Sequence, residues 1–305
     1  MQTSDFIVLL ARQRSGTNPL RSVLETHPKI ACTEEVLNVE PTPDYELEVE
    51  TNYFRFLDKR LEGDLLRFLS LEHQEALFLD YLEYLRAFYD KQYLVVDVKY
   101  NSVHHLEGAW RFLTEEPALF RFIKTHGLRV INLTRRNFLR YYVSELKAQA
   151  SRIWDVFDEE VVGDKPWFMR QFVETGRARA RYEDRNIEIE PRAMLEALDL
   201  CRRENDVVSA AFADYSGYVT FDYQELFPRL GDPPSDAILT RITRWLGVDD
   251  DFGERKPQYK KQSDLPLPET IANWDEVAAT LQGTDFEYCL ADEAMYKASA
   301  ETGSG

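Results

Sequence analysis

The chain has 305 residues, of which 44% are hydrophobic and 13% aromatic, so it can fill a sizeable core. Its 54 acidic and 37 basic residues give a formal charge of −17, which argues against a protein that coats nucleic acid. No apolar run approaches the roughly 18–20 residues of a membrane span, and the N-terminal sequence is not typical of a signal peptide. We therefore expect a cytoplasmic protein with no nucleic-acid partner and no integral membrane segment.

The N-terminal third begins with a pattern typical of a strand, a loop and a helix. The apolar run at 6–11 is short and continuous, as in a strand buried on both faces. It breaks at 12–18 and resumes with helical spacing at 19–24. A second strand is predicted at 30–33, leading into Glu34 and Glu35.

The rest of the chain alternates between helical and strand-like patterns. Residues 40–92 have mostly helical spacing. Further strands are predicted at 93–99, 128–134 and 218–222, with a helix after the fourth strand and another at 236–246, closed by Gly247. Strands separated by helices imply an α/β fold with a mostly parallel sheet and ligands beyond the carboxyl ends of its strands.

The three cysteines are far apart in sequence and show no metal-binding spacing, so we interpret them as thiols of a reducing compartment. No linker rich in proline or glycine divides the chain. We predict one domain over 1–298, followed at 299–305 by a flexible tail or a remnant left by cloning.

The loop after the first strand has the residues of an anion site. Gly16 lets an anion approach the backbone, Ser15 and Thr17 add hydroxyl donors, and Arg14 adds positive charge. The free N–H groups and the dipole at the following helix start favour a phosphate there. No lysine follows Gly16 as in a Walker A loop, which disfavours a nucleotide kinase or an ATPase.

A second candidate anion site follows the fourth strand. Arg136 stands at the carboxyl end of that strand, and Ser144 lies two helical turns further on. An arginine at a helix start often pairs with surface carboxylates. Here, however, candidate anion sites follow the ends of two separate strands, which favours an anion-binding role for Arg136. Two such sites suit a nucleotide that carries phosphate groups at both ends.

At these residues the chain resembles the sulfotransferases that use 3′-phosphoadenosine 5′-phosphosulfate, with bacterial carbohydrate sulfotransferases of the trehalose 2-sulfotransferase and nodulation-factor type as the best match. The segments that carry the resemblance, in chain order, are Arg14–Thr17, Thr26–Asn38, Arg136 with Ser144, Val219–Leu226, Lys260–Ser263 and Asn273–Val277. Gln13 stands where proline is usual, and Asn18 and Pro19 stand where two hydroxyl residues are usual.

The resemblance implies a P-loop-like three-layer αβα fold with helical insertions, the sulfate nucleotide as donor cosubstrate and no metal. It implies a possible homodimer and a small-molecule hydroxyl acceptor, a carbohydrate or glycolipid. The donor-binding residues that it implies are Arg14, Ser15, Gly16, Thr17, Asn18, Pro19, Arg136, Ser144, Lys260, Lys261 and Gln262. Arg14 would also act in catalysis, beside the bridging oxygen of the donor.

The general base that takes the acceptor proton is predicted to be Glu35, from the acidic position of the resembling enzymes. Its neighbour Glu34 is an alternative, as is a histidine after Lys99, namely His104 or His105; of these we place His105 with the catalytic residues.

We expect residues 36–92 and 154–185 to form the acceptor pocket. The second stretch is rich in aromatic residues and arginine, and its pattern equally suits an amphipathic helix that packs on the sheet or on another subunit. A non-catalytic nucleotide-binding protein of the same fold is the alternative function.

Overall fold

The computed structural model describes residues 3–39, 50–63, 71–107, 115–151, 156–157, 186–227, 234–253, 259–260 and 265–292. At its centre, five described strands form one sheet in the order β2-β3-β1-β4-β6, and every neighbouring pair is parallel. The strands span β1 Phe6–Ala11, β2 Ile30–Glu35, β3 Tyr93–Lys99, β4 Arg129–Thr134 and β6 Tyr218–Asp222. The predicted strands are thus confirmed, with small differences at their ends.

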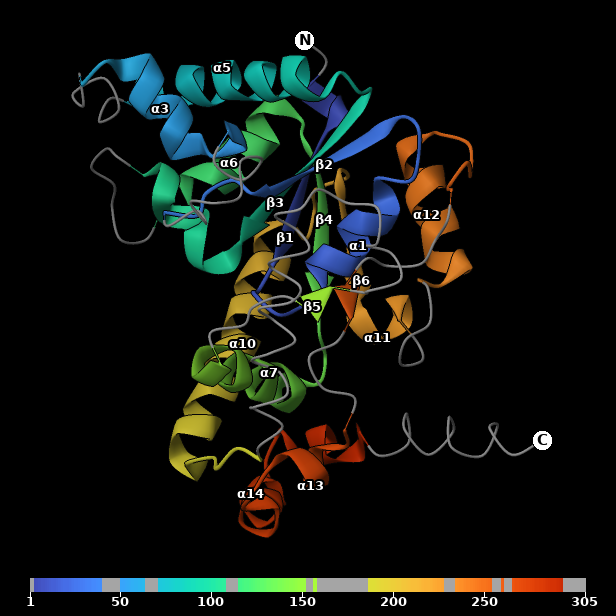
Figure 1. Cartoon of the computed structure of the whole chain (residues 1–305). Coiled ribbons are helices and arrows are strands. Elements are labelled where there is room, and N and C mark those ends of the chain that lie inside the picture. The colour runs from blue at the N-terminus through green and yellow to red at the C-terminus, as the bar shows by residue number, and fades with distance from the viewer. Residues whose placement is uncertain are drawn as a thin grey trace.

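The helices cover both faces of this sheet (Figure 1). One face packs against α3 Tyr53–Leu61, α5 Leu71–Tyr89, η2 Tyr100–Leu106 and α6 Ala118–His126. The other packs against α1 Thr17–Leu24, α11 Tyr223–Leu226 and α12 Asp236–Leu246. These three layers confirm the predicted αβα architecture, and Gly247 ends α12 in the left-handed conformation, as expected.

The alternation of side chains along β1 explains why both faces need helices. Phe6, Val8 and Leu10 point into one core cluster, whereas Ile7 and Leu9 point into the other. All five are essentially inaccessible to solvent. A strand buried on both faces needs this continuous apolar run.

A third hydrophobic cluster lies beyond the carboxyl ends of the strands, at the bottom of Figure 1. Its described members belong to α7 Phe138–Ser151, α10 Pro191–Ala211, α13 Leu267–Thr270, α14 Trp274–Leu281 and η3 Glu287–Asp292. Nearby, β5 Val156–Phe157 and β7 Tyr259–Lys260 form a short antiparallel pair. The remaining short element, η1 Thr3–Asp5, precedes β1.

The strand register brings distant parts of the sequence to one edge of the sheet. Ala11, the last residue of β1, lies beside both Lys99 of β3 and Leu133 of β4. Glu35 of β2 lies beside Asp97 of β3. The loop that follows β1 is therefore flanked by the ends of its neighbouring strands.

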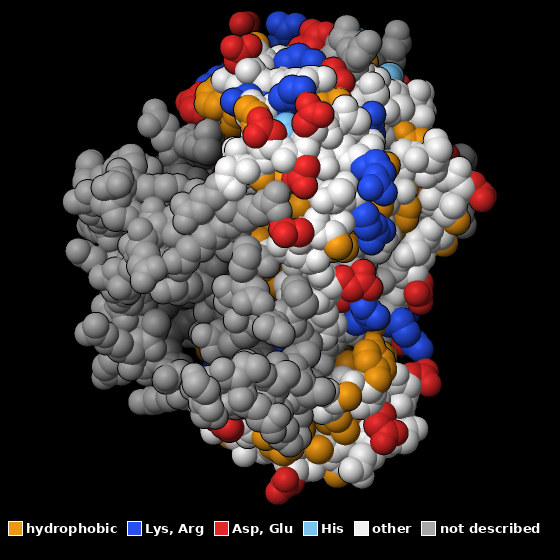
Figure 2. All heavy atoms as spheres, turned by 90° about the vertical axis from the view of Figure 1, so that its right-hand side faces the viewer, with side chains coloured by type: hydrophobic (Ala, Val, Ile, Leu, Met, Phe, Trp, Pro, Cys, Tyr) orange, Lys and Arg blue, Asp and Glu red, His pale blue; other side chains and the backbone are white. Residues whose placement is uncertain are grey.

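The face in Figure 2 shows acidic and basic side chains interspersed, with scattered hydrophobic ones. Among the helices of the described ranges, none has the length and apolar character to cross a membrane. Cys32, Cys201 and Cys289 are buried thiols.

Candidate functional site

The loop between β1 and α1 has an unusual backbone. Arg14 has a φ of 63° and Gly16 a φ of 90°, so two residues of this short turn are left-handed. The left-handed region is unfavourable for a residue with a side chain, and such strain is found where a structure holds a functional loop. Gly16 is the N-cap of α1, and no side chain caps that helix start. A helix start without a side-chain cap is a kind of site at which backbone N–H groups can bind an anion.

Gly16 is required by space as well as by its backbone angle. A Cβ atom at this position would lie 2.4 Å from two ring carbons of Tyr223. Tyr223 is buried, and the Arg135 guanidinium lies over its ring at 4.9 Å from the centroid. Arg135 also donates a hydrogen bond of 3.1 Å from Nη1 to the carbonyl of Arg14. The loop is thus held from the side of β4 and β6.

Arg14 and Ser144, predicted to belong to two anion sites, contact each other. The Nε of Arg14 donates to the Oγ of Ser144 over 3.2 Å. The structure therefore brings α7 to the loop and places both polar groups on one side of it.

A half-buried cluster supports this end of α7. Arg12 pairs with Glu204 of α10 and lies over the Tyr141 ring of α7, 4.6 Å from its centroid. Burial raises the pKa of the Glu204 carboxyl, and the Arg12 charge opposes that shift. Burial and a hydrogen bond to Glu145 raise the pKa of Tyr141. Because Tyr141 and Ser144 share α7, this cluster fixes the helix against the loop.

Arg136 lies at the same edge of the sheet with its side chain 63% exposed. Its backbone N–H donates to Asp222 Oδ2 at 2.9 Å, and its Nη2 donates to Glu225 Oε1 at 2.8 Å. No hydrogen bond joins it to Ser144. The predicted pair of Arg136 and Ser144 thus lies at one edge of the sheet without direct contact, and Arg136 contacts acidic side chains.

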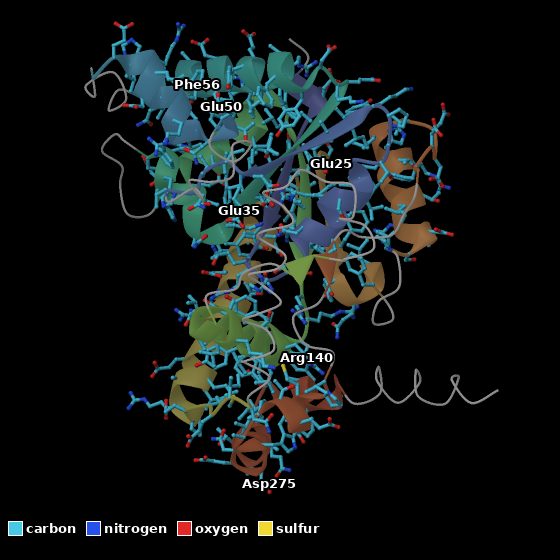
Figure 3. All side chains as sticks on the ribbon, viewed as in Figure 1. Glu25, Glu35, Glu50, Phe56, Arg140 and Asp275 are labelled. Carbon is cyan, nitrogen blue, oxygen red and sulfur yellow. The ribbon has the colours of Figure 1, made fainter. Side chains whose placement is uncertain are left out.

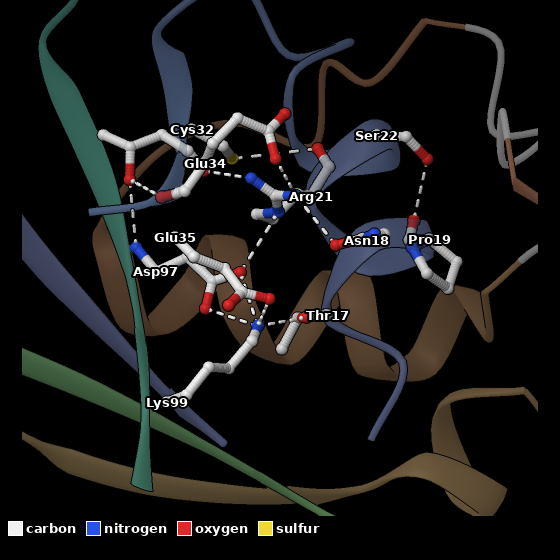
Figure 4. A network of polar contacts seen from close by, with 11 residues as sticks. Thr17, Asn18, Pro19, Arg21, Ser22, Cys32, Glu34, Glu35, Asp97 and Lys99 are labelled. Carbon is white, nitrogen blue, oxygen red and sulfur yellow. Dashed lines mark hydrogen bonds and ion pairs between the residues drawn. The ribbon is translucent and has the colours of Figure 1, made fainter. Parts of the chain in front are cut away.

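Lys99 connects the loop with the acidic residues of β2 (Figure 4). Its side chain is only 3% exposed. Its Nζ donates to Thr17 Oγ1 at 2.7 Å and to the two carboxylate oxygens of Asp97 at 2.7 and 2.9 Å. It also lies 3.4 Å from Glu35 Oε1. One ammonium therefore contacts the loop and two carboxylates.

The neighbouring glutamate has a different partner. Glu34 Oε2 accepts a hydrogen bond of 2.6 Å from Arg21 Nη2, and Arg21 also donates to Asn18 Oδ1 at 2.8 Å and to the Thr33 carbonyl. Arg21 is buried. Glu34 is therefore part of a structural contact between α1 and β2.

Exposure also separates the two glutamates. The Glu35 side chain is 31% exposed and that of Glu34 is 19% exposed. Figure 3 labels Glu35 toward the middle of the molecule, near the end of β2. Of the two, Glu35 is the carboxylate that lies beside the loop and remains more accessible.

The two histidines follow β3 on η2. His105 Nδ1 lies 2.9 Å from the carbonyl of Leu37, and its ring packs edge-on against Phe54. His104 is exposed and pairs with Glu107 at 3.2 Å. The His105 ring is thus held by the backbone of Leu37, two residues after Glu35 in the sequence, whereas His104 faces solvent.

The remaining predicted residues are only partly described. The backbone of Lys260 belongs to β7, which lies against α1. Lys261, Gln262 and residues 158–185 of the expected acceptor pocket lie outside the described residues. Within the described part of the chain, no group of three His, Cys, Asp or Glu side chains can hold a metal ion.

Asp97 and Arg21 are two residues of the site that were not predicted from the sequence. Asp97 and Lys99 are two residues apart in a strand, so both side chains point to the same face. A charged pair inside an otherwise apolar, fully buried strand was a detectable signal, because buried charges need partners. The partner Arg21 was not detectable, since only the folded chain brings it there.

No protein-family model matches the sequence, and no curated protein matches it. Among solved structures, the chain is similar to the crystal structure of a sulfotransferase from Alicyclobacillus acidocaldarius. The two chains are 12% identical, the match covers 97% of this chain and 95% of that one, and the TM-score is 0.41. Such an identity does not extend that protein's function to this chain.

Proposed function

We propose that the protein is a sulfotransferase that moves a sulfuryl group from 3′-phosphoadenosine 5′-phosphosulfate to a hydroxyl of a small carbohydrate or glycolipid. The observation that carries this proposal is one ammonium placed between the loop after β1 and a carboxylate. Lys99 Nζ lies 2.7 Å from Thr17 Oγ1 and 3.4 Å from Glu35 Oε1. Sulfuryl transfer to an alcohol needs a cation facing the donor next to a base facing the acceptor.

The residues of the loop fit the 5′ end of such a donor. The start of α1 has no side-chain cap, so its N–H groups and dipole favour an anion. Pro19 lies in the first turn, where its missing N–H costs no helical hydrogen bond. The donor, when bound, supplies the activated sulfuryl group.

The opposite end of the donor would meet the cations beyond β4. Arg136 is exposed at the end of that strand, and Ser144 lies on α7. We assign the 3′-phosphate to these two residues, with Lys260, Lys261 and Gln262 closing over it. Binding there would require Arg136 to leave Glu225, an exchange of one exposed ion pair for another.

The proposed reaction is an in-line exchange of bonds at sulfur. The acceptor hydroxyl oxygen forms a bond to sulfur while the bond from sulfur to the bridging phosphate oxygen breaks. Glu35 takes the hydroxyl proton, so that the sulfate ester and adenosine 3′,5′-bisphosphate are released. Arg14 and Lys99 face the bridging oxygen as it gains negative charge.

The test combines calorimetric binding of adenosine 3′,5′-bisphosphate with transfer from the sulfate donor to a panel of sugars and glycolipids, detected by mass. We expect binding and at least one sulfated product. Arg14→Met should weaken binding, whereas Arg192→Met, on an exposed side chain of α10, should not. Binding without any product supports the non-catalytic alternative, and tighter binding of ATP with Mg²⁺ overturns the donor assignment.

A further inference from the structure

A fully buried carboxylate lies directly behind the proposed site. The Asp97 side chain is 0% exposed, and its carboxylate forms ion pairs with Lys99 and Arg21. Lys99 Nζ donates to both of its oxygens at 2.7 and 2.9 Å, and Arg21 Nε lies 3.3 Å from Oδ2. A buried carboxylate is tolerated only when charges of opposite sign compensate it.

From this arrangement we infer that Asp97 is a positioning residue that holds Lys99 against the loop and keeps Glu35 available as a base. Asp97 approaches the Lys99 ammonium more closely than Glu35 does, at 2.7 Å against 3.4 Å. The ammonium is therefore directed to Thr17 and Asp97 more than to the more exposed Glu35. The catalytic part of this inference rests on the proposed function; the placement of Lys99 does not.

Asp97 can position Lys99 because each of the two cations beside it also contacts a glutamate. Asp97 contacts Lys99 and Arg21, and these two cations also contact Glu35 and Glu34, respectively. The charges of Asp97, Glu34, Glu25 and Arg21 also act on the buried Cys32 thiol. Along the other edge of β3, β1 contributes only apolar side chains. Asp97 thus competes with Glu35 for Lys99 and with Glu34 for Arg21.

Removing the charge of Asp97 ends this competition. Lys99 and Arg21 would then lose the carboxylate that they both contact. Arg21 would keep Glu34, and Lys99 would pair with Glu35. The nearby cation would stabilise the ionised form of Glu35 and make it a weaker base.

The placement is tested in the free protein with Asp97→Asn. Competitive labelling of amines with acetic anhydride, read by peptide mass spectrometry, compares Lys99 with the exposed Lys59. In the wild type Lys99 should react far more slowly than Lys59. In Asp97→Asn its rate should rise toward that of Lys59; an unchanged rate overturns the inference.

The catalytic part is tested by the pH dependence of kcat. We expect Asp97→Asn to lower kcat about tenfold and to move the acid limb of its profile down by about 1 pH unit. In a Lys99→Met background the Asp97 substitution should shift the limb no further. The control is Asp5→Asn, which breaks a partly buried ion pair with Arg86 at the other end of β1. It should lower stability and leave the limb in place.

Loss of folding does not end the test. If Asp97→Asn does not fold, a double variant with Arg21→Gln removes one charge of each sign and is read by the same labelling. A wild type without transferase activity refutes the proposed function, while the labelling still decides the placement of Lys99. A normal pH profile in folded Asp97→Asn overturns the catalytic part alone.

Discussion

Gly16→Ala tests whether the loop after β1 is held as tightly as the structure indicates. Alanine at this position has two costs. The φ of 90° costs an L-residue about 1–2 kcal/mol, and the Cβ would lie 2.4 Å from the Tyr223 ring, an overpacking that costs about 1–3 kcal/mol. We therefore expect a loss of about 2–5 kcal/mol in the free energy of unfolding.

The ring cannot move aside at little cost. Tyr223 is buried, packs against Phe227 at 5.1 Å between ring centroids, and lies under the Arg135 guanidinium. The loop must yield instead, and its N–H groups would move with it. We therefore expect Gly16→Ala also to weaken binding of adenosine 3′,5′-bisphosphate by about tenfold.

Gly247→Ala is the matched control, because Gly247 has a φ of 76° and no atom within 4 Å of an added Cβ. Both variants are compared with the wild type by urea denaturation. Gly247→Ala should lose only the conformational contribution to the free energy of unfolding, about 1–2 kcal/mol. In a Tyr223→Ala background, which removes the ring, Gly16→Ala should cost about as much free energy of unfolding as Gly247→Ala. Equal losses in Gly16→Ala and Gly247→Ala would refute the crowding argument.

Three further predictions concern single residues. Arg136→Ala should change the free energy of unfolding by less than about 1 kcal/mol, since the Arg136 side chain is 63% exposed. It should still weaken binding of the bisphosphate, and calorimetry that shows equal affinity refutes its assignment to the 3′-phosphate. Glu34→Gln should lower stability by about 1–3 kcal/mol, because buried Arg21 loses a charged partner, and should retain transferase activity; lost activity with normal folding would make Glu34 a candidate base. Burial raises the pKa of the Cys201 thiol to about 12, so about one in ten thousand is ionised at pH 8. Its reaction with a disulfide reagent should stay slow until the pH approaches that value or urea unfolds the chain, and rapid labelling of the folded protein contradicts this.

The sheet was predictable because its strands are buried on both faces. The continuous apolar run at Phe6–Ala11 and the apolar start of Tyr93–Lys99 predict strands without knowledge of their partners. The end of α12 was predictable from Gly247, which supplies a left-handed residue. The helix at Pro191–Ala211 was not predicted, although Glu190 caps it and proline occupies its first position.

The candidate site was predictable as a loop where one segment carries its residues. Arg14–Thr17 are neighbours that form the loop after β1, whereas the left-handed conformation of Arg14 was not predicted. The contact of Arg14 with Ser144 and the position of Arg21 beside Asp97 depend on packing between distant elements. No local pattern specifies those distances, so the different contacts of Glu34 and Glu35 required the folded structure.

The central claim is that Glu35 takes the acceptor proton while the loop holds the donor. It is tested most directly by single-turnover sulfuryl transfer in Glu35→Gln, with Glu83→Gln on the exposed face of α5 as control. We predict that Glu35→Gln binds adenosine 3′,5′-bisphosphate as the wild type does and transfers about 10²–10⁴ times more slowly, with Glu83→Gln unaffected. A transfer rate for Glu35→Gln equal to that of the wild type would contradict the account.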